Sequence, residues 1–141
     1  REVVMLTLGT GVGGGLILNG RLYSGARGIA GELGHFTLYQ GGRKCPCGKR
    51  GCLEEYASTT ALIARAERQT GRTGWNGRMI FEGASQGDPL LRLALDGWLD
   101  DVAAGVTGLV HIFNPELVLI GGGVSAQEEL LLKPLRGCWR A

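Results

Sequence analysis

Four potential metal ligands lie close together in the chain, and they restrict its folding more than any other feature. His35, Cys45, Cys47 and Cys52 occur in the run G-E-L-G-H…C-P-C-G-K-R-G-C-L-E. A structural zinc ion takes four thiolate or imidazole ligands in a tetrahedron, and three cysteines with one histidine are an accepted set. The spacing differs from the paired C-x2-4-C units of zinc fingers and zinc ribbons. We therefore predict a closed zinc site that folds this segment around a single ion.

A disulfide is the alternative for the three cysteines. It would leave one thiol unpaired, and it would imply a secreted protein. The sequence contains no signal peptide, no apolar span long enough for a membrane and no N-x-S/T acceptor. Thiols that hold a metal instead fit a reducing compartment, so we expect a cytoplasmic protein without membrane contact.

The composition is typical of a folded protein with one hydrophobic core. The chain has 141 residues, of which 44% are hydrophobic and 20% are charged. Its formal net charge of +2 is too small to indicate nucleic-acid binding by bulk electrostatics. A basic cluster lies beside the cysteines, and we interpret it as a solvated loop rim: Arg43, Lys44, Lys49 and Arg50. The 26 glycines gather in short clusters, which favours close approach of the backbone to a ligand.

The pattern of apolar residues predicts a mixed α/β fold. Residues 3–8 and 14–19 are predicted strands joined by G-T-G-V-G, and Asn19-Gly20 between apolar runs indicates a hairpin turn. The strongest helical periodicity covers residues 89–113. A buried strand is predicted at 117–120.

Weaker signals predict the remaining segments. We expect a short strand at 35–39, a cysteine loop at 40–54, a helix from Ser58 that Gly71 ends, a loop containing Trp75 and Gly77, and a helix from Ser125. The chain begins at once with a core strand and ends on a helix that no strand completes. We therefore expect residues 1–141 to form a single partial domain of a larger protein.

Two glycine clusters are candidate ligand sites. Gly121–Gly123 lies between a strand and a helix, an arrangement that admits a nucleotide at the carboxyl end of a strand. A tight strand-to-helix crossover would explain the same glycines without any ligand. The first cluster, L-G-T-G-V-G-G-G, lacks G-K-[ST] and joins two strands, so it is not a P-loop. Its tip at Thr10, Gly11 and Gly13 can still present N–H groups and a hydroxyl to phosphate oxygens.

Two glutamates flank the cysteine loop. Glu32 and His35 are three residues apart in E-L-G-H, and Glu54 follows the last cysteine by two residues. Folding of the loop onto a metal would bring Glu54 toward Glu32. Carboxylates and an imidazole at one place can hydrogen-bond the hydroxyls of a sugar. The alternative is that both glutamates are ordinary surface charges.

Taken in order along the chain, these motifs resemble the ROK family of bacterial sugar kinases and sugar-responsive repressors. The matching runs are L-T-L-G-T-G-V-G-G-G, G-E-L-G-H, C-P-C-G-K-R-G-C-L-E and N-P-E-L-V-L-I-G-G-G-V-S. The resemblance covers almost the whole chain. It implies an α/β fold: the C-terminal lobe of an actin-like ATPase (RNase H-like) protein with a zinc-binding loop. The N-terminal lobe would be absent from these 141 residues.

The resemblance also implies roles for individual residues. Nucleotide contacts are implied for Thr10, Gly11, Gly13, Gly14, Gly121, Gly122 and Gly123. Sugar contacts are implied for Glu32, His35 and Glu54, and zinc ligation for His35, Cys45, Cys47 and Cys52. His35 would serve both sites through its two ring nitrogens. A zinc ion with four protein ligands has no open position, so it would orient the loop and take no part in the chemistry.

In the family reaction, ATP transfers its γ-phosphoryl group to a sugar hydroxyl while Mg²⁺ neutralises the phosphates. The family's first phosphate motif and its catalytic aspartate belong to the amino-terminal part, and neither occurs in this sequence. We therefore expect no catalytic residue in this chain and no phosphoryl transfer by the chain alone.

Three functions compete at this point. We favour a lobe of an ATP-dependent kinase for a hexose or N-acetylhexosamine, because a kinase must keep an intact phosphate hairpin. The alternative is the sugar-binding effector part of a ROK repressor, in which a preceding segment would bind DNA. A zinc module that binds nucleic acid through the basic cluster is disfavoured by the small net charge. Because the family often forms dimers, we also expect a homodimer.

Overall fold

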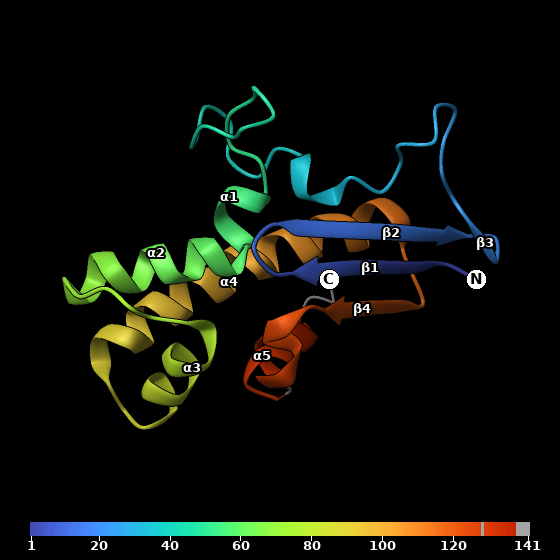
Figure 1. The fold of residues 1–141 in the computed structure, drawn as a ribbon. Coiled ribbons are helices and arrows are strands. Elements are labelled where there is room, and N and C mark those ends of the chain that lie inside the picture. Colours follow the sequence, from blue (N-terminus) through green and yellow to red (C-terminus); the bar gives the residue numbers. More distant parts are fainter. Residues whose placement is uncertain (128, 138–141) are drawn as a thin grey trace.

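The computed structural model of the chain describes residues 1–127 and 129–137 (Figure 1). Its elements, in chain order, are β1 (Val3–Leu8), β2 (Val12–Leu18), β3 (Arg21–Leu22), η1 (Leu33–His35), α1 (Glu54–Ala57), α2 (Thr59–Thr70), α3 (Gly77–Ser85), α4 (Pro89–Phe113), β4 (Leu117–Gly121), η2 (Gly123–Gln127) and α5 (Glu129–Leu135). The strands form one sheet, α4 runs along one of its faces, and α2 and α3 lie beyond the end where β1 finishes (Figure 1). The cysteine loop projects from the sheet next to α1 (Figure 1).

The sheet brings the two glycine clusters to one edge. Its strand order is β3-β2-β1-β4, with β1 and β2 antiparallel and β1 and β4 parallel. Thr7 pairs with Gly121, so the carboxyl ends of β1 and β4 lie side by side. The glycine hairpin that follows β1 and the glycines that follow β4 therefore open toward the same space.

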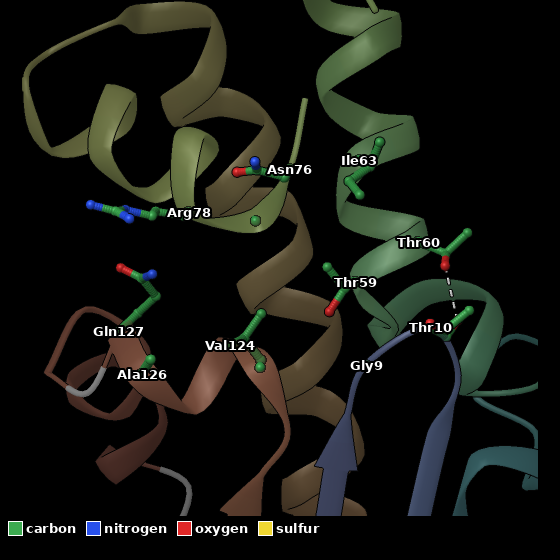
Figure 2. Close-up of a pocket in the computed structure, with 12 residues that line it drawn as sticks. Gly9, Thr10, Thr59, Thr60, Ile63, Asn76, Arg78, Val124, Ala126 and Gln127 are labelled. Carbon is green, nitrogen blue, oxygen red and sulfur yellow. Dashed lines mark hydrogen bonds between the residues drawn. The ribbon is translucent and has the colours of Figure 1, made fainter. Parts of the chain in front are cut away.

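The tip of the β1–β2 hairpin is tied to the first turn of α2. The backbone N–H of Thr59 donates to the carbonyl of Gly9 at 2.7 Å. The hydroxyl of Thr60 donates to the carbonyl of Thr10 at 2.9 Å, as the dashed line in Figure 2 shows. Ser58 caps this helix by accepting the N–H of Ala61. The glycine-rich tip is thus held at a fixed place against a helix.

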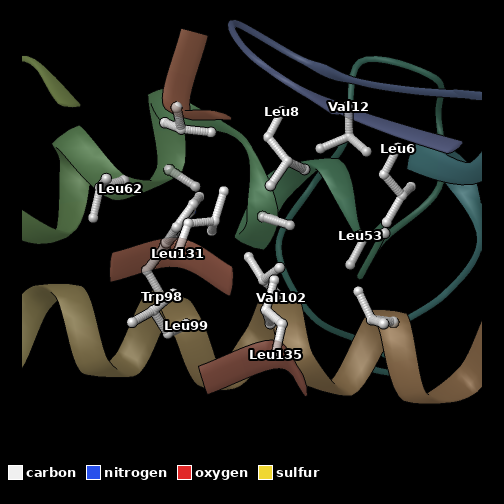
Figure 3. Close-up of a cluster of buried hydrophobic side chains, with 14 of the residues drawn as sticks. Leu6, Leu8, Val12, Leu53, Leu62, Trp98, Leu99, Val102, Leu131 and Leu135 are labelled. Atoms are coloured by element: carbon white, nitrogen blue, oxygen red, sulfur yellow. The ribbon is translucent and has the colours of Figure 1, made fainter. Parts of the chain in front are cut away.

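The core lies between the sheet and α4 (Figure 3). Leu6 and Leu8 of β1 point toward Trp98 and Val102 of α4, and each of the four is at most 1% exposed. The indole N–H of Trp98 donates to the carbonyl of Ser58 at 2.9 Å. A large buried ring is therefore accommodated without an unpaired donor, and α4 is joined to the start of α2.

The long helix predicted at 89–113 is confirmed as α4. Asp88 accepts the backbone N–H groups of Leu90 and Leu91, which satisfies donors that a helix start leaves open. The helix ends at Asn114, whose φ of 42° is left-handed. Among the described residues, no helix is both long and apolar enough to cross a membrane.

The strand predicted at 35–39 is wrong. Leu33–His35 forms a single 3-10 turn, and Thr37 makes only an isolated bridge with Cys52. The N–H groups of Leu38 and Tyr39 both donate to the carbonyl of Gly51. This segment therefore pairs with its own loop and not with a strand of the sheet.

The loop predicted around Trp75 and Gly77 contains a helix, α3. Asn76 caps it by accepting the N–H of Met79 at 2.9 Å. The helix predicted from Ser125 is also displaced, because a 3-10 segment, Gly123–Gln127, precedes α5. Glycine at the first helical position concealed the start of α3 in the sequence.

Candidate functional site

The predicted metal ligands converge in the structure. The ligand atoms of His35, Cys45, Cys47 and Cys52 all lie within 4.8 Å of one another. The Sγ atoms of Cys47 and Cys52 are 3.5 Å apart, and Cys45 Sγ lies 3.7 Å from His35 Nδ1. A tetrahedral ion with metal–sulfur bonds of 2.3 Å sets its ligands about 3.8 Å apart. The three cysteines are free thiols, so the cluster could hold one metal ion.

Two glycines allow the cysteine loop to close. Gly48 and Gly51 have φ values of 97° and 82°, which side chains with a Cβ rarely adopt. A Cβ at Gly51 would also overlap the carbonyl of Tyr39. The N–H of Cys45 donates to the carbonyl of Lys49 at 2.9 Å, which closes the turn around the thiols.

The three thiols do not lose their protons equally. The backbone N–H of Lys49 and the Cys45 thiol lower the pKa of Cys47 to about 7. Burial, followed by the neighbouring thiols, raises the pKa of Cys52 to about 12. A metal that binds here must displace the proton of Cys52, which a cation close to the sulfur achieves.

Val12 is the point where the cysteine loop meets the glycine hairpin. Its backbone N–H donates to Glu54 Oε1 at 2.9 Å. Its carbonyl lies directly against Gly34, where an added Cβ would overlap it. Glu54 also has a carboxylate oxygen within 4.8 Å of Cys45 Sγ. The structure therefore brings the E-L-G-H segment, the cysteine cluster and the hairpin together around one residue.

The predicted sugar-contact residues differ in their surroundings. Glu54 and His35 are half-buried, and Nδ1 of His35 faces Cys45, so Nε2 is the ring nitrogen that remains for a second partner. Glu32 is exposed, and its carbonyl accepts the N–H of His35 at the start of η1. The Glu54 carboxylate thus has a partner in the backbone of Val12, whereas the Glu32 side chain is exposed to solvent.

A cavity of about 500 Å³ opens at the edge of the sheet where the two glycine clusters meet (Figure 2). It is lined by Gly9, Thr10, Thr59, Thr60, Ile63, Asn76, Gly77, Arg78, Gly123, Val124, Ala126 and Gln127. Ile63 and Val124 give it apolar walls, while Arg78 and Gln127 project from its far side (Figure 2). Apolar walls with hydroxyl, amide and guanidinium groups suit a planar base attached to phosphates.

Only part of the predicted nucleotide set lines this cavity. Thr10 and Gly123 do, and Gly11 lines a neighbouring cavity of about 540 Å³ together with Glu54. Gly122 has a φ of 94° and passes against the carbonyl of Leu8, so it serves the strand-to-helix crossover.

The other three predicted glycines lie within strands. Gly13 and Gly14 belong to β2, where an added Cβ would come within 2.6 Å of Thr7 Oγ1 and 2.7 Å of Leu33 respectively. Gly121 ends β4, where a Cβ would lie 3.2 Å from Met5. Close packing accounts for the absence of side chains at Gly13 and Gly14.

Several lining residues were not predicted from the sequence. Asn76 caps α3 and Arg78 lies in its first turn, in a segment that was expected to be a loop, and Thr59 lies in the first turn of α2. Asn76 followed by apolar residues at helical spacing is the signal that could have revealed them. Their convergence with Thr10 depends on the packing of helices that are distant in sequence.

Comparison with known proteins finds one family, whose members include kinases and repressors. A sequence model of the ROK family matches residues 1–140. The chain is 41% identical to a glucokinase of Thermotoga maritima, over 96% of this chain and 47% of that protein. It is 35% identical to a xylose repressor of Caldicellulosiruptor bescii, over 96% of this chain and 37% of that protein. The chain spans about half the length of the curated kinases that it matches.

Solved structures agree with this. The ROK family glucokinase from Streptomyces griseus, in complex with glucose and AMPPNP, superposes with a TM-score of 0.91 at 36% identity. The alignment covers 99% of this chain and 50% of that chain. The likeness confirms the predicted fold class, an α/β lobe of the actin-like ATPase type.

Proposed function

The chain belongs to the ROK family, and on that basis we propose that it is the C-terminal lobe of an ATP-dependent kinase for a hexose or N-acetylhexosamine. In this proposal the lobe supplies the sugar-binding and zinc-binding residues and part of the nucleotide site. The rest of the protein supplies the first phosphate loop and the catalytic base. The observation that carries the proposal is the intact hairpin tip, which borders a nucleotide-sized cavity at Thr10 and a carboxylate at Gly11.

The proposed sugar site lies on the Glu54 side of the hairpin. Glu32, His35 and Glu54 offer carboxylate oxygens and one imidazole nitrogen to the hydroxyls of a sugar ring. Because Glu54 already accepts the N–H of Val12, its carboxylate is held in one orientation before any sugar arrives. Such preorganisation reduces the entropy lost on binding.

The proposed nucleotide site lies on the other side of the hairpin. The adenosine would occupy the cavity between α2, α3 and η2, and the phosphates would extend along Thr10 and Gly11 toward Glu54. The N-terminus of α2 is near the same tip and favours negative charge. The Streptomyces griseus relative is in complex with both glucose and AMPPNP, which supports a protein that binds a sugar and a nucleotide together.

We assign the metal site to zinc because three thiolates and an imidazole are its usual structural ligands. Bound zinc would fix the geometry of the cysteine loop. His35 would use Nδ1 for the metal and leave Nε2 for a sugar hydroxyl. The chain's own contribution to phosphoryl transfer is then positioning: it holds the sugar and the phosphates at neighbouring places, while Mg²⁺ accompanies the ATP.

A ROK repressor is the second candidate, because the chain also resembles a xylose repressor. In that case the lobe would bind a sugar as a signal, and another part of the protein would bind DNA. A repressor has no need of a phosphate cradle, so the hairpin and the cavity beside it favour the kinase. A homodimer and a cytoplasmic location remain predictions from the sequence.

The proposal can be tested with Glu32→Gln in the complete protein. The exchange keeps the shape of an exposed side chain but removes its charge, so we expect the sugar dissociation constant to rise about tenfold or more. The nucleotide constant should stay within about twofold. Glu116→Gln is the matched control, since Glu116 is also exposed and directly precedes β4, which lies on the other side of β1 from the hairpin strand β2. Equal losses of sugar and nucleotide affinity would contradict separate sites.

A further inference from the structure

A carboxylate lies in the buried stretch of α4. Asp101 is 3% exposed, and its neighbours Trp98, Leu99 and Val102 all belong to the hydrophobic core (Figure 3). An ionised carboxylate in such a place is costly unless charged or hydrogen-bonding partners surround it. The partners of Asp101 therefore indicate why it is there.

Two side chains from other parts of the chain meet Asp101. The hydroxyl of Tyr39 donates to Oδ1, and the guanidinium of Arg65 in α2 lies 2.5 Å from Oδ2. The hydrogen bond to Asp101 raises the pKa of Tyr39, so its hydroxyl keeps its proton at neutral pH. Gly97 leaves space for the guanidinium, because a Cβ there would overlap it. We call Tyr39, Arg65 and Asp101 the Asp101 cluster.

Among the described residues, the Asp101 cluster leaves one of its buried polar groups unpaired, so stability alone does not explain it. Arg65 Nε is buried and has no hydrogen-bond partner in the described part of the chain. Buried ion pairs often contribute less stability than apolar residues of the same size. A role in holding a particular geometry explains the cluster better than stability does.

The geometry that it holds is the base of the cysteine loop. Tyr39 directly precedes this loop, and its backbone N–H donates to the carbonyl of Gly51, next to Cys52. The ring of Tyr39 packs on the ring of Tyr56 with centroids 4.5 Å apart. Tyr56 belongs to α1, the short helix that begins with Glu54.

A second contact joins α1 to the same loop. The hydroxyl of Tyr56 accepts the N–H of Arg43 at 2.9 Å, and the Arg43 guanidinium lies 4.3 Å from the Tyr56 ring centroid. Gly42 packs against that hydroxyl so closely that a Cβ would overlap it. A displacement of Tyr39 would thus be transmitted both to Cys52 and to the helix that carries Glu54.

We propose that Asp101 is a positioning residue that holds Tyr39, and through it the base of the cysteine loop, so that Glu54 and His35 face the sugar. The inference rests on the proposed sugar site. The metal ligands fix the loop internally, whereas the Asp101 cluster fixes it relative to α2 and α4. The two anchors are separate, so loss of the Asp101 cluster leaves the metal bound but the loop displaced.

Tyr39→Phe in the complete protein tests this, because it removes only the hydroxyl. Tyr39 and Tyr23 are each 46% exposed, and the N–H of Tyr23 donates to the carbonyl of Leu16 in β2, so Tyr23→Phe is the matched control. We expect Tyr39→Phe to raise the sugar dissociation constant about tenfold, the loss typical of one hydrogen bond to a charged group. Zinc content should not change, and the nucleotide constant should stay within about twofold. Hydrogen exchange across residues 36–56 should become faster in this variant alone.

Other outcomes would overturn the inference. These are a Tyr39→Phe variant that behaves like Tyr23→Phe, or one that loses sugar affinity, nucleotide affinity and thermal stability together. Asp101→Asn, which keeps the side-chain shape, must reproduce the selective loss of sugar affinity.

Glu54→Gln separates this inference from the proposed function. If Glu54→Gln weakens sugar binding while Tyr39→Phe does not, only the positioning role fails. If Glu54→Gln has no effect on sugar binding, the sugar site itself is wrong. In that case, hydrogen exchange of residues 36–56 decides whether Tyr39 anchors the cysteine loop. An exchange rate that Tyr39→Phe leaves unchanged would reject the anchoring role.

Discussion

Glu54 joins two parts of the chain that are distant in sequence. Its carboxylate accepts the N–H of Val12 and lies beside Gly11, while its neighbours in the chain belong to the cysteine loop. One side chain therefore binds the glycine hairpin and also lies within 4.8 Å of the Cys45 sulfur. A sugar bound to Glu54 would lie next to the proposed path of the phosphates, which is the arrangement that direct transfer between them requires.

The role of the thiols can be tested with Cys47→Ser. A hydroxyl is a poor zinc ligand compared with a thiolate, so we expect the bound metal to fall from about one ion per chain to a small fraction. Elemental analysis after dialysis measures this directly. Cys138→Ser is the control, because Cys138 is separate from the His35–Cys52 run and lies outside the described residues. Unchanged metal content in Cys47→Ser would reject the ligand assignment.

Among the secondary-structure elements, the β1–β2 hairpin gives the most direct prediction about nucleotide binding. A side chain at Gly11 would project into Glu54 Oε1, whereas a Cβ at Gly15, in the same hairpin, meets nothing within 4 Å. We predict that Gly11→Val raises the nucleotide dissociation constant more than about tenfold, because the tip is displaced and phosphate approach is blocked. Gly15→Val should leave it nearly unchanged. Calorimetric titration of both variants measures the difference in nucleotide affinity. Equal affinities would show that the hairpin is not part of the nucleotide site.

The elements that could be predicted are those that local pattern determines. A run of apolar residues placed β1, and helical periodicity with Asp88 as a cap placed α4. The segment 35–39 looked apolar enough for a strand, but its backbone partner is Gly51 within the same loop. The helix α3 was missed because Gly77 stands at its start.

The candidate site was predictable to a similar degree. The metal ligands share one short run, so their spacing alone predicted that they converge. The lining of the cavity by Asn76 and Arg78 depends on the packing of α3 against α2, α4 and η2. The Asp101 cluster joins residues that are 36 and 62 positions apart, and no local pattern relates them.

For the molecule as a whole, the two proposed ligand sites lie on opposite sides of one hairpin. The nucleotide-sized cavity is bounded by α2, α3 and η2, and the sugar-contact residues are carried by η1 and α1. The chain covers about half of its kinase relatives, so the proposed reaction needs groups from the rest of the protein. In this account, the chain binds and aligns both reactants.

The most direct test of this account is to measure ADP formation by the complete protein with ATP and Mg²⁺, using glucose and N-acetylhexosamines as acceptors. The account predicts ADP formation that depends on the sugar and that Gly11→Val and Glu54→Gln both reduce by about tenfold or more. Sugar binding without sugar-dependent ADP formation, combined with DNA affinity that the sugar changes, would contradict the kinase and identify the protein as a repressor.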